Sequence, residues 1–306
     1  MSVQPEQLLC PVLVGREDEL ATLRVALDRA WQGRTHGLFI RGEAGIGKSR
    51  LCRALIKDTQ LRGLTPIVGL CSPQSTRLPY GPIVDALRRT SARIRSTAEE
   101  LRPALASVLP VLAPLLPELG GEAVGDRVTA AMPDESPAVL RRRLFEALAY
   151  AMRTLASYRR AGASESVPLV LILDDLHWAD ESTLDLLEYL LRTTTGIDDG
   201  APGEGLLIVG TFRSETMASA PALVRTVSAL IAARVAREME LRPLTPEQLA
   251  RLLEATVGRA MPPDVVAAFF ERSEGSPFVA EELLGALAAA GHLDSARHAG
   301  RAPSNS

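Results

Sequence analysis

Up to residue 241, short apolar runs alternate with longer segments in which apolar residues recur at helical spacing. The short runs predict buried strands, and the longer segments predict amphipathic helices, such as one over residues 16–31. The run at 169–173 is apolar throughout, as in a central strand covered on both faces. Strands that alternate with helices indicate a parallel α/β sheet. The five expected strands lie at residues 38–40, 67–71, 169–173, 206–209 and 239–241.

After Leu241 the sequence predicts helices without strands between them. Thr245–Gln248 has the residues of a capped helix start: a threonine N-cap, a proline at the first helical position and a glutamine able to close a capping box. Two more helices are expected, at 263–274 and 277–290. The predicted organisation is therefore a leader, an α/β domain, a small helical lid and a disordered tail, over residues 1–12, 13–241, 242–291 and 292–306.

Composition limits the classes of protein that this sequence can encode. With 46% hydrophobic and 23% charged residues, the chain of 306 residues can fill a core. It has no apolar stretch of the ~18 residues that a membrane-spanning helix needs, and no secretory signal. The three cysteines form no CxxC pair, which is typical of reduced thiols and predicts a cytoplasmic protein. The net charge of -3 disfavours direct binding to duplex DNA.

A glycine-rich turn follows the first predicted strand and opens a helix. Its glycines allow backbone N–H groups to surround phosphate oxygens at the positive end of that helix. Lys48 would reach the β- and γ-phosphates, and the Ser49 hydroxyl would bind Mg²⁺. All 34 basic residues except Lys48 and Lys57 are arginine, which sets Lys48 apart. The expected nucleotide-binding segment matches G-x-x-x-x-G-K-[ST] and runs Gly42-Glu43-Ala44-Gly45-Ile46-Gly47-Lys48-Ser49-Arg50.

Polar residues follow two of the other predicted strands. Asp174 and Asp175 end the run at 169–173, where a parallel strand delivers side chains to the nucleotide crevice. Asp174 is expected to bind Mg²⁺ through water, and Asp175 to orient or deprotonate the attacking water. Arg213 follows the run at 206–209 and could contact the γ-phosphate. The alternatives are a solvated acidic pair that caps a loop, and a surface arginine.

Three other motifs accompany the glycine-rich loop. Leu13–Glu17 opens the first helix, Leu171–Asp180 contains the two aspartates, and Gly275–Pro277 precedes the last helix. Together with the loop and Thr211–Arg213, they resemble the P-loop module of the STAND class of AAA+-related signalling ATPases. The nearest resemblance is to the modules of large LuxR-type transcriptional regulators and of multidomain nucleotide cyclases. It covers residues 13–290 in the order of that family.

The resemblance implies a P-loop sheet of order 5-1-4-3-2 followed by a lid, with ATP or ADP and Mg²⁺ as ligands. It implies that the backbone of Val14, Gly15 and Arg16 lines the adenine and that Pro277 packs near the base. It also implies a switch ATPase of signalling or transcriptional control, whose partners are effector domains or other copies of itself. Two motifs have simpler interpretations, because Gly15–Glu17 can start a helix and Gly275–Pro277 can cap two helices.

Asp175 stands where many AAA+ ATPases have glutamate, which predicts slow conversion of ATP and water to ADP and phosphate. One alternative function is a regulatory module that holds a nucleotide without turnover, and a second is the ATPase part of a nucleotide-cyclase-type signalling protein. Another is a DNA-associated AAA+ ATPase of the origin-recognition type, which the net charge disfavours. Beside the acids, His177 and Trp178 are interpreted as a packed loop. Cys52 and Cys71 are interpreted as small core residues.

Overall fold

The computed structural model describes six stretches of the chain, and the described residues fall into two compact units. The sheet unit comprises Leu20–Arg41 and Cys52–Glu240, and the lid unit lies within Met1–Glu19, Gly42–Leu51 and Leu241–Ser306. The predicted tail and residues 1–8 of the predicted leader lie outside the described residues. None of the described helices is long and apolar enough to span a membrane. The described stretches are residues 9–74, 79–93, 103–116, 136–157, 168–194 and 205–290.

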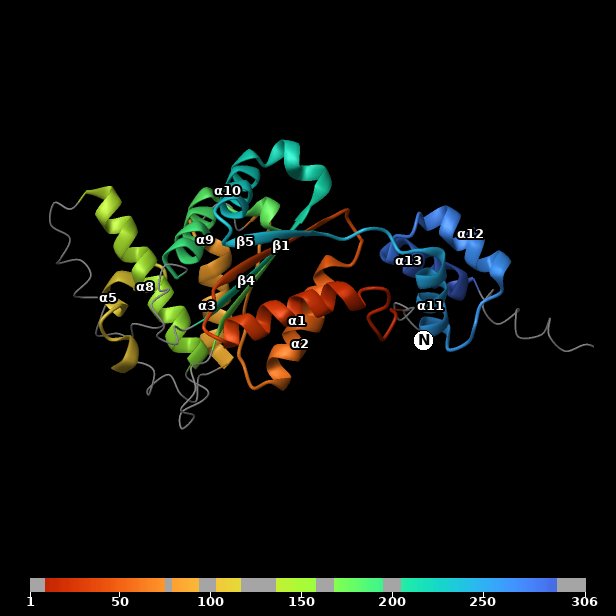
Figure 1. Ribbon diagram of the computed structural model, residues 1–306, viewed down its shortest axis with the longest axis horizontal. Coiled ribbons are helices and arrows are strands. Elements are labelled where there is room, and N and C mark those ends of the chain that lie inside the picture. The colour runs from red at the N-terminus through yellow and green to blue at the C-terminus, as the bar shows by residue number, and fades with distance from the viewer. Residues whose placement is uncertain are drawn as a thin grey trace, which may run out of the picture. The chain divides into compact units, whose positions relative to one another are not determined.

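The sheet unit is built on a five-stranded parallel sheet (Figure 1). Its order, β2-β3-β4-β1-β5, confirms the predicted 5-1-4-3-2. The register pairs Leu169 with Leu206 and Leu173 with Gly210, so β3 and β4 run side by side to their carboxyl ends. The strands are β1 (His36–Gly42), β2 (Ile67–Leu70), β3 (Leu169–Asp174), β4 (Leu206–Arg213) and β5 (Ala236–Glu240).

Helices flank both faces of the sheet, as right-handed crossovers between parallel strands require. Figure 1 shows α1 and α2 on one side of the sheet and α9 and α10 on the other. The apolar residues of β3 are buried, as expected for a strand covered on both faces. The elements are α1 (Glu17–Trp31), α2 (Lys48–Leu61), α3 (Gly81–Arg93), α5 (Leu109–Leu112), α8 (Pro137–Ser157), η4 (Leu176–Trp178), α9 (Glu181–Thr194), η5 (Ser214–Ser219) and α10 (Pro221–Ala232).

The last strand begins and ends earlier than predicted. The expected strand at 239–241 is wrong at both ends, because β5 spans Ala236–Glu240. β5 lies at the edge of the sheet, and of its five residues only Ala236 is buried. An edge strand tolerates charged side chains, so its sequence lacks the apolar run on which the prediction relied.

The lid unit contains three C-terminal helices, α11 (Pro246–Val257), α12 (Pro263–Ser273) and α13 (Pro277–Ala289). The predicted capping box is confirmed: the backbone N–H of Gln248 donates to Thr245 Oγ1, and Gln248 Oε1 accepts the backbone N–H of Thr245. The lid unit also contains the glycine-rich loop, which the sequence-based division had grouped with the sheet. The division at 241/242 stays a prediction. The core of the helices comprises Cys10, Leu244, Leu249, Leu252, Leu253, Val266, Phe269, Ala280 and Leu284.

Candidate functional site

The glycine-rich loop joins the end of β1 to the first turn of α2. Gly45 and Gly47 have φ angles of 76° and 102°, which glycine adopts without the strain that a Cβ would cause. Glu43, Ala44 and Gly45 are exposed, and α2 begins at Lys48. The loop therefore has the strand–loop–helix context that its phosphate-binding interpretation requires.

Lys48 is buried within the loop, with 7% of its surface exposed. Its Nζ donates to the carbonyl oxygens of Gly42 at 2.8 Å and Glu43 at 2.7 Å. These carbonyls supply the acceptors that a buried ammonium needs. A phosphate bound at the loop would compete with them for the same ammonium.

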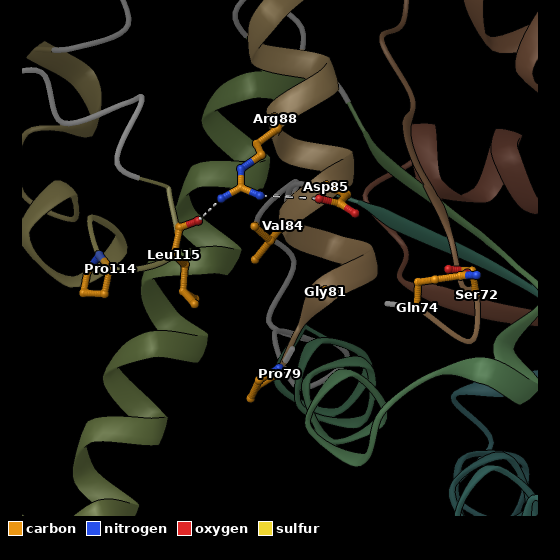
Figure 2. Close-up of a pocket in the computed structure, with 9 residues that line it drawn as sticks. All are labelled: Ser72, Gln74, Pro79, Gly81, Val84, Asp85, Arg88, Pro114 and Leu115. Atoms are coloured by element: carbon orange, nitrogen blue, oxygen red, sulfur yellow. Dashed lines mark hydrogen bonds and ion pairs between the residues drawn. The ribbon is translucent and has the colours of Figure 1, made fainter. Parts of the chain in front are cut away.

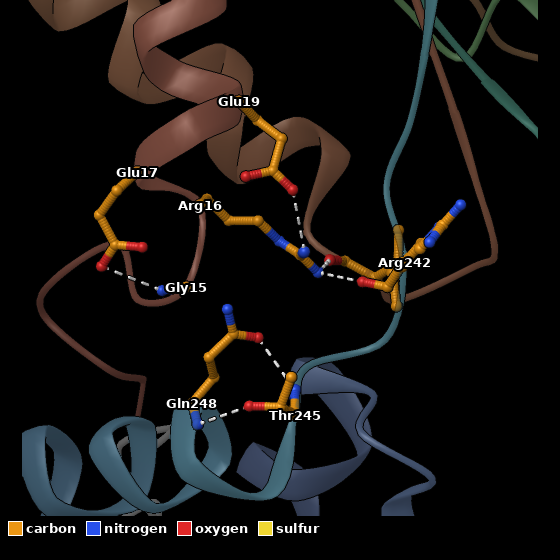
Figure 3. Close-up of polar contacts among 8 residues, drawn as sticks. Gly15, Arg16, Glu17, Glu19, Arg242, Thr245 and Gln248 are labelled. Carbon is orange, nitrogen blue, oxygen red and sulfur yellow. Dashed lines mark hydrogen bonds and ion pairs between the residues drawn. The ribbon is translucent and has the colours of Figure 1, made fainter.

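Arg16 joins the loop to the segment that leads into α11 (Figure 3). Its guanidinium donates to the carbonyl oxygens of Ile46 at 3.1 Å and Arg242 at 2.7 Å, and to Glu19 Oε1 at 3.3 Å. Burial lowers the pKa of the guanidinium, and the Glu19 carboxylate opposes that shift. The sequence-based expectation concerned the backbone of Arg16, and it missed this role of the side chain.

We expect Arg16→Met to lower the free energy of unfolding by about 2–4 kcal/mol, because it removes a buried charged donor from two carbonyl acceptors. Urea denaturation would measure the change. Arg251→Met is the matched control, since Arg251 forms an exposed ion pair with Glu17 at 3.2 Å and should cost less than ~1 kcal/mol. Equal losses in the two variants would show that Arg16 does not hold the loop.

Gly15 has a φ of 66°, and a Cβ there would lie 2.7 Å from Cδ of Gln248. The positive φ, together with close packing against the Gln248 side chain at the start of α11, favours glycine at this position (Figure 3). Val14 is half-buried beside it. The helix α1 begins at Glu17, directly after Arg16. The packing explains Gly15 structurally, and the expected adenine contact of residues 14–16 stays a prediction.

Two contacts link the loop and α2 to helix α13. The Phe278 N–H donates to the Gly45 carbonyl at 3.3 Å. Arg50 forms an ion pair with Glu281 at 2.7 Å and also donates to the Cys10 carbonyl. Glu281 is largely buried and accepts the Cys10 N–H at 2.9 Å. Arg50, which was expected to belong to the nucleotide-binding segment, thus contacts the lid helix in this structure.

The Gly275–Pro277 motif has a capping geometry. Gly275 has a φ of 76°, and a Cβ there would lie 2.4 Å from the Leu244 carbonyl oxygen. Pro277 is buried at the first position of α13, and Ser276 is its N-cap residue. The Ser276 hydroxyl makes no capping hydrogen bond, unlike that of Thr245. Backbone shape therefore explains this motif more than hydroxyl capping does, and the expected contact of Pro277 with the base stays a prediction.

In the sheet unit, Asp174 is the last residue of β3 and is held by Thr211 of β4. The Thr211 hydroxyl donates to Asp174 Oδ1 at 2.5 Å and accepts the Asp175 N–H at 3.0 Å. Within the described chain, Asp174 Oδ2 has no hydrogen-bond partner. This geometry fixes one carboxylate oxygen and leaves the other for a hydrated cation, which fits the predicted Mg²⁺ role. Thr211 was not predicted as a site residue. The sequence signal for it was a hydroxyl residue close to the end of the apolar run at 206–209.

Asp175 has a φ of 60°, in the left-handed region that aspartate tolerates better than most residues. The His177 ring lies 3.8 Å from its carboxylate and is 2% exposed, and Trp178 packs against the same ring. Asp180, at the end of the motif, accepts from the N–H and hydroxyl of Thr183 in the first turn of α9. The packed-loop interpretation of His177 and Trp178 is therefore compatible with the structure.

Arg213 ends β4, two residues after Thr211. Side chains two apart on a strand lie on one face, about 6.6 Å along it. Arg213 is thus placed on the face of Thr211 and Asp174, one step closer to the carboxyl end of the sheet. It is half-exposed, as a ligand-contacting arginine requires.

Cys52 and Cys71 are buried, and both thiols are free. Burial raises the pKa of both thiols, that of Cys71 to about 12, with nearby aspartates adding to the effect. Both thiols therefore stay protonated and unreactive near neutral pH. Their interpretation as core residues is confirmed.

A pocket of about 300 Å³ lies beyond the carboxyl end of β2 (Figure 2). Pro79 and Gly81 line it at the start of α3. Arg88 closes one side, where it donates to the Leu115 carbonyl at 2.9 Å and pairs with Asp85 at 3.5 Å. The sequence predicted helices in this region but gave no indication of a pocket.

The parallel sheet, its strand order and the loop between β1 and α2 define a P-loop nucleotide-binding fold. The chain belongs to the AAA ATPase domain family, whose model matches residues 12–209. A curated protein of Rhizobium meliloti (strain 1021), itself uncharacterized, is 26% identical over 284 residues. The match covers 89% of this chain and 24% of that protein, so the chain spans about a quarter of the length of its relative.

Three solved structures have a similar fold. The Aeropyrum pernix ORC1 protein in complex with DNA is 20% identical, with a TM-score of 0.50, over 96% of this chain and 68% of that one. Cdc6p from Pyrobaculum aerophilum is 16% identical, with a TM-score of 0.51, over 95% and 66%. Drosophila ORC bound to DNA is 14% identical, with a TM-score of 0.50, over 95% and 63%. At these identities the likeness concerns the fold.

Proposed function

We propose that this AAA ATPase domain binds Mg-ATP at the glycine-rich loop, hydrolyses it slowly and acts as a conformational switch. One observation carries the switch: the loop and the start of α2 are joined to α13 by the Gly45 carbonyl and the Arg50–Glu281 ion pair, and Arg16 joins the loop to the segment that leads into α11. A ligand that changes the loop must change the partners of these groups. If the lid has two arrangements, the ligand shifts the equilibrium between them by the difference in its affinity for the two.

Phosphate binding would act on the loop through Lys48 and the backbone. The N–H groups of residues 43–48 would bind phosphate oxygens at the N-terminus of α2. Lys48 would exchange the carbonyl oxygens of Gly42 and Glu43 for the β- and γ-phosphates. The two carbonyl oxygens would then have lost their hydrogen-bond donor, which favours a rearrangement of the loop that contacts Phe278 and Arg16.

Ser49 and Asp174 would supply oxygen ligands to Mg²⁺, which neutralises charge on the phosphates during hydrolysis. Thr211 would orient Asp174 through its 2.5 Å hydrogen bond. Asp175 would orient or deprotonate the attacking water. Its side chain is one methylene shorter than the glutamate of many AAA+ ATPases, which supports slow turnover.

We expect Asp175→Asn to lower the rate of phosphate release at least ~100-fold, because the amide cannot accept a proton. Its Kd for Mg-ATP should change by less than about threefold, since the carboxylate is assigned to the water and not to nucleotide binding. Asp185→Asn is the matched control, because Asp185 pairs with Arg141 at 2.9 Å near the surface. Wild-type phosphate release that Asp175→Asn leaves unchanged would favour a module that holds nucleotide without turnover.

The finer role that we propose is regulation of a signalling or transcription protein in the cytoplasm, of the STAND type. Its support is the order of the motifs along the chain, the lid contacts and the free thiols of Cys10, Cys52 and Cys71. The curated relative is about four times as long as the matched region, which is consistent with a module that drives other domains. The effector domains and any self-association belong to this proposal, as does the division into residues 13–241 and 242–291.

A second candidate is a DNA-associated AAA+ ATPase. Two of the structures with a similar fold, those of the Aeropyrum pernix ORC1 protein and of Drosophila ORC, were solved with DNA. The net charge of -3 makes this chain a weaker candidate for duplex binding. Affinity for duplex DNA that falls steeply with salt concentration would favour the DNA role over the signalling role.

A further inference from the structure

A second concave site lies in the sheet unit, at the amino-terminal end of β1. It is a pocket of about 320 Å³ between α1 and the edge pair of strands, β1 and β5. The residues that line it include Ala21, Val25 and Arg29 on α1, His36 and Leu38 on β1, and Arg237 on β5. Nothing in the proposed ATPase chemistry uses these residues.

The fold directs three basic side chains into this pocket. Arg29 lies four residues after Val25 on α1, so the two share one face of the helix. His36 and Leu38 are two apart on β1 and share one face of the sheet. Leu38 is paired in parallel register with Arg237, which therefore lies on that face too. The three bases come from three different elements, and their convergence is a property of the tertiary fold.

Among the described residues, the positive charge in the pocket is not balanced by acids that line it. Asp28, next to Arg29 in the sequence, pairs with Arg62 at 2.5 Å, and Glu238, next to Arg237, pairs with Arg41 at 3.0 Å. Within the described part of the chain, Arg29, His36 and Arg237 form no ion pair or side-chain hydrogen bond.

The electrostatics of His36 reflect this surplus of charge. Burial lowers the pKa of His36, and the charges of Arg237 and Arg29 lower it further. A bound anion would act in the opposite direction, because it favours the protonated ring. The half-buried histidine is therefore a local reporter of anion binding.

We propose that this pocket binds a phosphate group. Two guanidinium groups present pairs of N–H donors that match two oxygens of a phosphate, and a protonated imidazole adds a third donor. Leu38 is buried and gives the pocket an apolar floor, and charge-assisted hydrogen bonds above an apolar surface are stronger than in open water. The ligand class is inorganic phosphate or a small phosphomonoester, bound independently of the nucleotide at the glycine-rich loop.

The test is a titration of the full chain with inorganic phosphate, in which binding is monitored through the NMR signal of the His36 Cε1–H group. His36→Gln assigns the signal among the four histidines. We expect a saturable shift and a rise in the pKa of His36 on binding. Arg29→Gln and Arg237→Gln should each weaken the apparent Kd at least ~10-fold, as the loss of a charge-assisted contact does. Arg225→Gln, at an exposed arginine on α10, is the matched control and should leave the Kd unchanged.

Two other titrations separate phosphate recognition from weaker effects. Sodium chloride at equal ionic strength should not reproduce the shift, and acetate should bind more weakly than phosphate. A signal that does not saturate, that chloride reproduces, or that survives in both arginine variants would overturn the site. A response to acetate as strong as to phosphate would overturn the assignment to phosphate. Because the two arginines are replaced separately, one variant that fails to fold still leaves the other as a test.

Discussion

Replacing Lys48 with alanine should abolish most of the thermal stabilisation that Mg-ATP gives to this protein. With ATP at ~1 mM and a Kd near ~1 μM, ligand binding stabilises the folded state by about 4 kcal/mol. For a chain of this length, that raises the Tm by at least several degrees. Lys48→Ala removes the ammonium that would bind the β- and γ-phosphates. A thermal melt with and without Mg-ATP measures the shift.

Lys57→Ala is the control for this experiment, because Lys57 is the second lysine of the chain and is exposed on the same helix. Lys48 also donates to two carbonyls of its own loop, so its variant is judged by the ligand-induced change in Tm and not by the Tm alone. A wild-type melting curve that Mg-ATP leaves unchanged would contradict nucleotide binding.

Arg213→Ala should weaken ATP far more than ADP. If Arg213 contacts the γ-phosphate, it has no such contact with ADP. Its removal should therefore lower the affinity for ATP and leave the affinity for ADP unchanged. A charge-assisted contact is worth about 1.5–3 kcal/mol, or roughly ten- to more than a hundredfold in affinity. Calorimetric titration of ADP and of a non-hydrolysable ATP analogue against wild type and variant would measure both ratios.

The matched control is Arg192→Ala, since Arg192 is an exposed arginine of the sheet unit that pairs with Glu188 at 2.8 Å. Equal effects of Arg213→Ala on ATP and ADP would remove Arg213 from the γ-phosphate role. The assignment of Lys48 would stand, and Arg50 would be the next residue to test, because it connects α2 to the lid.

A helix or strand could be predicted where its own sequence has an apolar run, a helical spacing of apolar residues or a capping motif. The apolar run at 169–173 identified a buried central strand, and Thr245–Gln248 identified the start of α11 from capping chemistry. The order of the strands came from resemblance to a family, since periodicity does not specify which strands are neighbours. β5 was misplaced because a charged edge strand has no apolar run.

The candidate site was harder to predict because its contacts join residues far apart in the sequence. The Arg16–Arg242 hydrogen bond spans 226 positions, and the Arg50–Glu281 ion pair spans 231. No local pattern marks such partners. Thr211 was missed for a different reason. Only the charged residue of Thr211–Arg213 was assigned a role, whereas the Thr211 hydroxyl, two positions earlier, binds Asp174.

Amide hydrogen exchange in the lid helices would show whether the nucleotide at the loop switches the lid. The exchange rates of α11, α12 and α13 would be compared between protein saturated with a non-hydrolysable Mg-ATP analogue and protein saturated with Mg-ADP. We expect different exchange in α13, because the Gly45–Phe278 and Arg50–Glu281 contacts connect that helix to the loop and α2. Identical exchange throughout the lid, with both nucleotides protecting residues 42–51, would contradict this expectation.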